Sequence, residues 1–187
     1  HDTCRDDPHL ALGVNVLGTL NLIKAATERN VNQFIFASTD WVYGDTHGKT
    51  PLTEEQVIDV AKIETEYALT KLTGEQALRL AHQRGACPVT VLRFGIVYGP
   101  PPNNNGAIES LFAAVQTQDA VQVGSLATAR RFIHISDLAE GICSAIGRTG
   151  FEVFNLSGND LISLKDIIES SSQFFGRSPE VRETNPA

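Results

Sequence analysis

The stretch from residue 33 to residue 38, Gln-Phe-Ile-Phe-Ala-Ser, decides the fold of this chain. It is a short, nearly continuous apolar and aromatic run, which is typical of a parallel strand covered on both faces. A long helix is predicted on each side of it, over residues 8–29 and 62–84, and a second apolar run follows at 88–94. Strands that alternate with long helices in this way indicate β-α-β units and a parallel sheet.

The rest of the chain continues this alternation and contains no internal repeat. The further predicted strands span residues 131–135 and 151–156, and the further helices span 107–116, 136–146 and 163–176. Ser163 and Asp166 resemble a capping box that opens the last helix. The fold class is therefore α/β, and in such sheets ligands gather at the carboxyl ends of the strands.

Composition limits the class of partner. The chain has 187 residues, a formal net charge of −7 and a sequence pI near 5.2. This acidic balance argues against nucleic acid or an anionic membrane, because phosphate contacts need clustered Lys and Arg. The longest apolar runs are shorter than a bilayer span. Three widely spaced cysteines without a CxxC pair indicate free thiols in a reducing, cytoplasmic compartment, and no metal site is predicted. Because the chain lacks methionine and begins with His1, we expect an internal piece of a longer protein.

The helix over residues 8–29 is unusually apolar around its circumference. Its apolar residues form two adjoining stripes: Leu10, Val14 and Leu17, and Leu12, Val16, Leu20 and Ile23. A helix with so wide an apolar surface is expected to be buried on two sides.

Tyr67 and Lys71 lie four residues apart in the second long helix, so the phenol and the ammonium share one helical face. A free tyrosine has a pKa of about 10, and a cation within roughly 4–6 Å lowers it by about 1–3 units. The positive charge of an oxidised nicotinamide would act in the same direction. The spacing predicts an acid/base tyrosine, against the alternative of a solvated tyrosine beside a lysine.

The end of the first strand carries polar side chains. Residues 38–44 read Ser-Thr-Asp-Trp-Val-Tyr-Gly, directly before the helix that carries the tyrosine and the lysine. Crossover geometry can bring Thr39 close to Tyr67, although Ser, Thr and Asp are also ordinary loop formers.

Several stretches, in order along nearly the whole chain, resemble the extended short-chain dehydrogenase/reductases, and within them the NAD-dependent epimerase/dehydratases of sugar nucleotides. They are NVLGT at 15–19, QFIFASTDWVYG at 33–44, YALTKLTGE at 67–75, LRFGIVYGP at 92–100, RRFIHISDLA at 130–139 and NLSG at 155–158. The resemblance implies the C-terminal half of a Rossmann-type doubly wound parallel sheet with part of a small substrate-binding lobe. Residues 1–187 would form one partial domain without its glycine-rich N-terminal half.

The resemblance also implies roles for single residues. Thr39 would bind the reacting substrate hydroxyl and Tyr67 would be the acid/base. Lys71 would tune the phenol and bind the nicotinamide ribose. Val14 and Gly95 fall where the family lines the cofactor pocket.

On the substrate side, the resemblance points to Asp40, Ile96 and Arg130. Arg130 falls where the family holds the diphosphate of a nucleotide-sugar; a plain surface arginine is the alternative. Trp41 stands in place of the second carboxylate of the dehydratases, which argues against dehydration, and Ile96 replaces the family's asparagine.

The implied partners are a nucleotide-sugar substrate, NAD as cofactor with NADP as the alternative, and a second copy of the chain packed through the two long helices. The residues 1–187 alone are expected to be inactive. The rival class is a non-catalytic NAD(P)-binding regulator or scaffold with the same fold.

Overall fold

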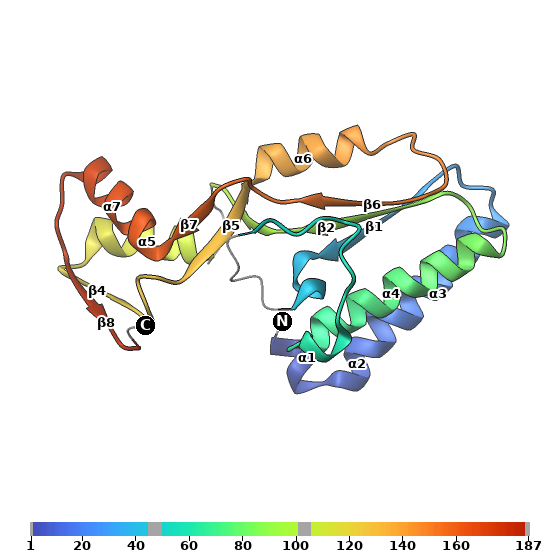
Figure 1. Cartoon of the computed structure of the whole chain (residues 1–187), viewed down its shortest axis with the longest axis horizontal. Coiled ribbons are helices and arrows are strands. Elements are labelled where there is room, and N and C mark those ends of the chain that lie inside the picture. The colour runs from blue at the N-terminus through green and yellow to red at the C-terminus, as the bar shows by residue number, and fades with distance from the viewer. Residues whose placement is uncertain (1, 45–49, 101–105, 186–187) are drawn as a thin grey trace. The chain divides into compact units, whose positions relative to one another are not determined.

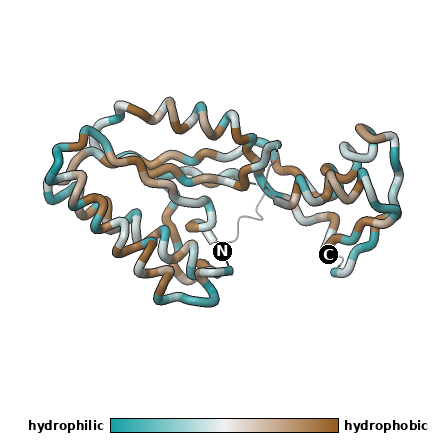
Figure 2. Tube along the Cα trace, turned by 180° about the vertical axis from the view of Figure 1, so that it is seen from behind, coloured by the Kyte–Doolittle hydropathy of each residue, from teal (hydrophilic) through white to brown (hydrophobic). Residues whose placement is uncertain are grey.

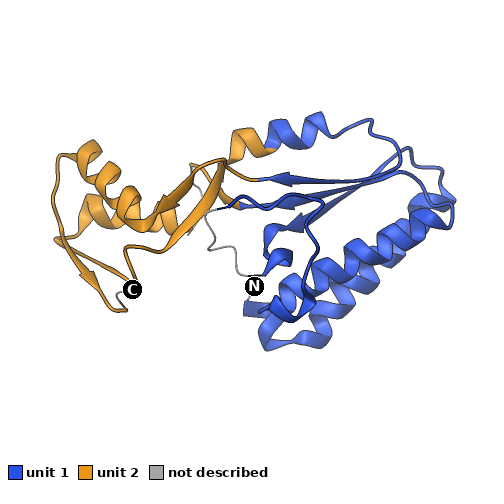
Figure 3. Ribbon diagram, viewed as in Figure 1, with its two compact units in different colours: residues 1–95, 139–156 blue, residues 96–138, 157–187 orange. Residues whose placement is uncertain are grey.

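The computed structural model describes residues 2–44, 50–100 and 106–185. The chain divides into two compact units (Figure 3). Unit 1 comprises His1–Gly95 with Ala139–Leu156, and unit 2 comprises Ile96–Leu138 with Ser157–Ala187. Each unit is described by itself below.

Unit 1 is built on a three-stranded parallel sheet. Its strands β1 (Phe34–Thr39), β2 (Val89–Phe94) and β6 (Phe151–Leu156) lie in the order β1-β2-β6. Helix α4 (Glu66–Gln83) packs on one face of this sheet, and the C-terminal half of α6 (Ile135–Ser144) lies over the other (Figure 1). The predicted α/β fold with a parallel sheet is confirmed.

The register of the sheet aligns three polar residues. Ser38, Arg93 and Asn155 are paired across the three strands, and each is the last residue but one of its strand. One apolar core cluster of unit 1 joins α3, β1, α4 and β2: Ile23, Phe36, Leu78, Val89 and Val91. A second cluster comprises Val42, Tyr43 and Leu72.

Residues 2–28 are helical except at Asp7, and the longer helical stretch contains one irregular turn. The elements are α1 (Asp2–Asp6), α2 (Pro8–Leu12), a π turn (Gly13–Leu17) and α3 (Gly18–Glu28). The Asp7 carboxylate caps α2 by accepting from the Leu10 amide, with Pro8 at the first helical position. In the π turn the Gly18 amide donates to the Gly13 carbonyl, five residues back.

The stretch Pro8–Glu28 buries only one side, so the expectation of burial on two sides is wrong within this chain. Ala11, Thr19 and Ile23 are buried. The apolar residues left exposed are Leu10, Leu12, Val14, Leu17, Leu20 and Leu22. The alternation of apolar and polar residues along the stretch can be followed in Figure 2. By length and composition alone, this 21-residue helical stretch is long and apolar enough to cross a membrane. The absence of a long uninterrupted apolar run in the sequence did not indicate this. Core helices of soluble proteins can have the same length and composition.

Among its described residues, unit 2 contains two small sheets, two helices and the first turn of α6. Strand β3 (Ile96–Tyr98) is parallel to β5 (Ala129–His134), which is antiparallel to β7 (Leu161–Ser163). Strands β4 (Ala120–Val123) and β8 (Glu180–Glu183) form a parallel pair. Helices α5 (Ala107–Thr117) and α7 (Leu164–Phe175) pack together over an apolar cluster that includes Val115, Val121 and Ile168. The Ser163–Asp166 capping box predicted for α7 is present.

Candidate active site

Helix α4 presents Tyr67 and Lys71 on one face near its beginning. Thr65 caps the helix by accepting from the Ala68 amide at 3.2 Å, so Tyr67 lies in the first turn. The Lys71 Nζ atom lies 5.7 Å from the centre of the Tyr67 ring and 5.2 Å from the centre of the Phe36 ring below it. Gly74 allows α4 to lie close to the Phe36 ring, because a Cβ at this position would be 2.8 Å from that ring.

The end of strand β1 places Thr39 and Asp40 beside this helix. Thr39 is the last strand residue, and its hydroxyl accepts from the Trp41 amide at 3.3 Å, which starts a 3-10 turn over Asp40–Tyr43. The turn packs against α4. The negative charge of Asp40 acts on the Tyr67 phenol, so the strand end and the helix face meet around these two side chains.

The electrostatics of the pair differ from the prediction. Burial raises the pKa of Tyr67, and the negative charges of Cys4 and Asp40 raise it further. Burial also lowers the pKa of Lys71. Burial and the two anionic neighbours all act in the same direction, so the predicted lowering of the tyrosine pKa is not found in the protein alone.

Asn15 ties the π turn to the same part of α4. Its side-chain Nδ2 donates to the Thr70 hydroxyl at 3.0 Å, and that hydroxyl donates to the Tyr67 carbonyl at 2.8 Å. The Thr19 hydroxyl donates to the Asn15 carbonyl at 2.7 Å, which supplies a partner where the π turn interrupts the regular ladder. The sequence motif contained Asn15, but no pattern in the sequence assigned it a contact.

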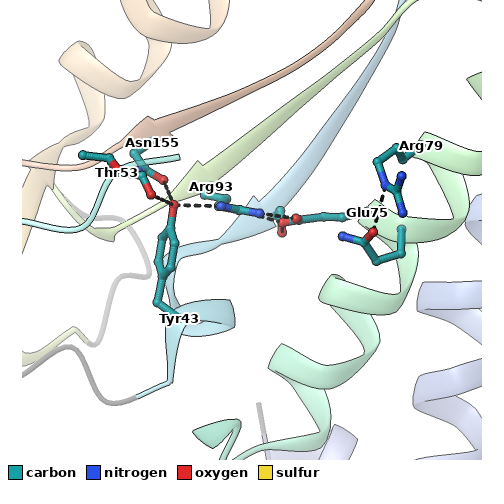
Figure 4. A network of polar contacts seen from close by, with 8 residues as sticks. Tyr43, Thr53, Glu75, Arg79, Arg93 and Asn155 are labelled. Atoms are coloured by element: carbon teal, nitrogen blue, oxygen red, sulfur yellow. Dashed lines mark hydrogen bonds and ion pairs between the residues drawn. The ribbon is translucent and has the colours of Figure 1, made fainter. Parts of the chain in front are cut away.

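A buried ion pair joins Glu75 of α4 to Arg93 of β2 (Figure 4). The Arg93 Nη2 atom is 2.6 Å from Glu75 Oε2, and its Nε atom donates to Glu75 Oε1 at 3.1 Å. The side chains of Glu75 and Arg93 are 1% and 5% exposed. Glu75 Oε1 also accepts from the Ser38 hydroxyl at 2.5 Å. The pair thus connects α4 with the ends of β1 and β2.

The same network continues through Tyr43 at the end of the 3-10 turn. Arg93 Nη1 donates to the Tyr43 hydroxyl at 2.7 Å, and this hydroxyl donates to Asn155 Oδ1 at 2.8 Å (Figure 4). Asn155 Nδ2 donates to the Leu52 carbonyl at 3.1 Å. The sequence motifs contained Glu75, Tyr43, Arg93 and Asn155, but only the structure joins them.

The other predicted site residues divide between the units. Val14 lies in the π turn, next to Asn15, and is 62% exposed. Gly95 follows β2, and its amide donates to the Leu156 carbonyl. Ile96 begins β3 and Arg130 lies on β5, both in unit 2. Arg130 pairs with Ile162 across the β5–β7 ladder.

The residues around Lys71 fit the nicotinamide ribose of a dinucleotide. Among the residues that the structure describes, the half-buried Lys71 ammonium contacts two aromatic rings and has neither a hydrogen bond nor an ion pair. A partly desolvated cation in this state favours a hydroxyl ligand.

Comparison with known proteins identifies the class. A family model described as the NAD dependent epimerase/dehydratase family matches residues 1–157. The chain belongs to this family.

Two curated relatives illustrate the range of similarity. The uncharacterized UDP-glucose epimerase YtcB of Bacillus subtilis is 30% identical over 166 residues, covering 87% of this chain and 51% of the relative. The UDP-glucuronate 4-epimerase of Thermodesulfobacterium geofontis is 28% identical over 177 residues, covering 92% and 53%. The chain thus spans about half the length of these relatives.

Solved structures agree in fold. MoeE5, in complex with UDP-glucose and NAD, matches with a TM-score of 0.79 and 25% identity over 94% of this chain and 58% of its own. The UDP-glucuronic acid 4-epimerase of Bacillus cereus, in complex with UDP-glucuronic acid and NAD, matches with a TM-score of 0.79 and 26% identity, covering 92% and 55%. RMD of Pseudomonas aeruginosa, complexed with NADPH, has a TM-score of 0.85 at 22% identity, covering 97% and 65%. These likenesses confirm the Rossmann-type fold.

Proposed function

We propose that the complete protein is an NAD-dependent oxidoreductase that acts on a hydroxyl group of a nucleotide-sugar, with Tyr67 as its acid/base. The observation that carries this proposal is the shared face of α4 beside the end of a parallel strand. There a partly buried ammonium, without an ion pair to any residue that the structure describes, lies 5.7 Å from the centre of a partly buried phenol ring. Family membership and the NAD named with MoeE5 and the Bacillus cereus epimerase support the same chemistry.

Each residue has a distinct role in this proposal. Tyr67 takes the proton of the substrate hydroxyl and returns it at the end of the cycle. Thr39 orients the substrate oxygen from the end of β1. Lys71 binds the ribose hydroxyls of the nicotinamide half, beside Val14 and Gly95. Bound NAD would supply the hydride acceptor and, in its oxidised form, a positive charge that favours the phenolate.

The raised pKa of Tyr67 makes this charge necessary. In the protein alone, burial and the nearby Asp40 keep the phenol protonated at neutral pH. Deprotonation therefore depends on positive charge brought to the site, which couples acid/base activity to cofactor binding.

We propose epimerisation rather than dehydration as the overall reaction. Removal of water from the sugar needs an acid and a base besides the tyrosine, and Trp41 replaces one of the two carboxylates that the dehydratases use. An indole at this position, 36% exposed next to Thr39, has no proton to exchange at neutral pH. Asp40 and, from unit 2, Ile96 and Arg130 are the proposed contacts to the nucleotide-sugar.

A second copy of the chain is the proposed partner of the exposed helix faces. Leu17 and Leu22 on the helical stretch Pro8–Glu28, and Leu69 and Leu80 on α4, are each more than a third exposed. Two such faces packed together would bury these side chains in a four-helix seam. The seam would also supply the second buried side that the sequence predicts for the first long helix.

The full-length protein tests the proposed chemistry. We expect purified wild-type protein to carry or bind NAD and to interconvert UDP-glucose or UDP-glucuronic acid with its C4 epimer. Tyr67→Phe should lower kcat by about 10²–10⁴-fold, the usual contribution of a positioned acid/base, while NAD remains bound. Normal turnover by this variant would show that Tyr67 is the wrong residue.

Lys71→Met tests the ribose contact, and Lys24→Met is its matched control. Lys24 is exposed and faces Glu28 at 4.0 Å on α3. We expect Lys71→Met to weaken NAD binding at least tenfold, as expected for loss of a charged hydrogen bond, and Lys24→Met to leave it unchanged. Equal NAD affinity in the two variants would contradict the assignment.

The rival is a regulator that binds the dinucleotide without turnover. The raised pKa of Tyr67 is the observation that favours it, because such a protein has no use for an activated phenol. NAD binding by wild-type protein without epimerisation of either nucleotide-sugar would support this class.

A further inference from the structure

We propose that the buried Glu75–Arg93 pair is a positioning device of the proposed active site. Through Ser38 and Tyr43 it holds both ends of the turn that carries Thr39 and Asp40. This inference rests on the proposed function, since it assigns a role in the same reaction to residues that touch neither substrate nor cofactor.

The turn is held from both sides. Thr39 and Asp40 are preceded by Ser38 and followed, after two residues, by Tyr43. The Ser38 hydroxyl donates to Glu75 Oε1 at 2.5 Å, and the Tyr43 hydroxyl accepts from Arg93 Nη1 at 2.7 Å. The two anchors therefore end on one ion pair, whose hydrogen bond to Tyr43 is shown in Figure 4.

Glu75 also fixes the turn relative to the acid/base. It lies on α4, four residues after Lys71 and eight after Tyr67, so the three side chains share one stripe of the helix. A shift of α4 along β1 would break the bond from Ser38 to Glu75. The distance between Thr39 and Tyr67 is therefore set by hydrogen bonds as well as by apolar packing.

The third strand completes this frame. Asn155 Oδ1 accepts from the Tyr43 hydroxyl at 2.8 Å, and the backbone N–H of Asn155 donates to Glu54 Oε1 at 2.6 Å. The polar layer formed by Ser38, Arg93 and Asn155 thus extends to β6, and Asn155 connects this strand to Glu54, which follows the turn in the sequence. Charge-assisted bonds of this length have narrow geometry and favour one arrangement over neighbouring ones.

Arg93 keeps its charge. Burial alone would lower the pKa of Arg93, but the hydrogen bonds and charges of Glu75 and Tyr43 outweigh burial and raise it. The guanidinium therefore does not act as an acid or a base in the site. Its role is to set positions.

Two mild variants of the full-length protein test this role. Ser38→Ala and Tyr43→Phe each remove one anchor and keep the Glu75–Arg93 pair. The matched control is Thr90→Val, which removes a partly buried hydrogen bond near the opposite end of β2. There the buried Thr90 hydroxyl accepts from Gln33 Nε2 at 2.9 Å. Turnover is measured with UDP-glucose and with UDP-glucuronic acid in the presence of NAD, alongside thermal unfolding.

We expect kcat to fall about tenfold or more in Ser38→Ala and Tyr43→Phe, because a small displacement of a reacting group costs 10–100-fold. KM should stay within about twofold of wild type, which indicates lost transition-state alignment rather than lost binding. Thr90→Val should lower Tm to a similar extent and leave kcat near the wild-type value.

The outcomes separate the two proposals. If wild-type protein turns over, Tyr67→Phe does not, and both anchor variants keep wild-type kcat, the positioning inference is overturned and the proposed function stands. An equal loss of kcat in Thr90→Val also overturns the inference, because general stability would then explain the effect. Absence of turnover in wild-type protein overturns both.

Discussion

The strongest quantitative prediction concerns removal of one partner of the buried ion pair. Glu75→Leu leaves the Arg93 guanidinium buried with the Tyr43 hydroxyl as its remaining hydrogen-bond partner among the described residues, because Nε and Nη2 lose the carboxylate. Loss of one partner of a buried pair costs about 3–5 kcal/mol in the free energy of unfolding. Arg93→Met should cost a similar amount, since within the described part of the chain it leaves the Glu75 carboxylate with the Ser38 hydroxyl.

The double variant should be far milder than the sum of the two. With Leu at 75 and Met at 93, no charge remains buried, and such replacements are often nearly neutral. We therefore expect a coupling energy of about 3 kcal/mol or more between the two positions, well above the limit of about 0.5 kcal/mol for independent sites.

Urea unfolding followed by circular dichroism provides the assay. With a slope of about 2 kcal/mol per molar urea, each single variant should lower the midpoint by about 1.5–2.5 M. If the single effects simply add in the double variant, or if Glu75→Leu costs less than about 1 kcal/mol, Glu75 and Arg93 do not form a buried pair and the reasoning fails.

Three further predictions concern pH, backbone conformation and assembly. Burial raises the pKa of Tyr67 above that of the unfolded chain. The contribution of this residue to stability is therefore present below about pH 10 and lost at higher pH. Between about pH 9 and 11, the unfolding free energy of wild-type protein should fall by more than that of Tyr67→Phe. Gly44→Ala should destabilise by roughly 2–5 kcal/mol in urea unfolding, since φ is +79° and a Cβ would lie 2.5 Å from a backbone oxygen; Gly85→Ala, with φ +94° and open space, should cost only about 1 kcal/mol. Leu22→Glu should dissociate the proposed dimer in sedimentation velocity, whereas Phe174→Glu, on an exposed residue of unit 2, should not.

The main elements of unit 1 could be predicted from the sequence because their signals are local. Residues 33–38 and 88–94 were expected as strands, and β1 and β2 occupy Phe34–Thr39 and Val89–Phe94. The first long helix was expected over 8–29 and is observed over Pro8–Glu28, with the π turn inside it. Helix α4 begins at Glu66, four residues later than predicted, because Thr65 provides the cap and Val60–Lys62 forms a separate 3-10 turn.

Unit 2 was predicted less completely. Strands β3, β4, β7 and β8 have three or four residues each, too few for a reliable apolar pattern. The antiparallel pairing of β5 with β7 could not be inferred either, because it depends on contacts between residues about 30 positions apart. The run of three prolines and three asparagines at residues 100–105 predicts an exposed loop. These residues lie, except for Pro100, outside the described part of the chain.

At the candidate site, the sequence predicts which side chains share a helical face, but not how deeply they are buried or which distant residues contact them. The proximity of Tyr67 and Lys71 follows from the helical repeat alone. The direction of the tyrosine pKa could not be predicted, because it depends on burial and on Cys4 and Asp40, which are distant in sequence. Likewise the joining of Glu75 and Arg93 depends on the packing of α4 over β1 and β2.

The π turn at Gly13–Leu17 has a consequence for protein engineering. An inserted helical residue rotates everything before it relative to everything after it by about a quarter of a revolution. Deleting one residue there would restore a regular α-helix. It would also either move the Asn15 side-chain amide away from Thr70 or rotate the leucines after the turn to a different side of the helix. A sequence alignment or a helix transplant that treats Pro8–Glu28 as one regular α-helix will therefore assign the residues on one side of the π turn to the wrong helical face.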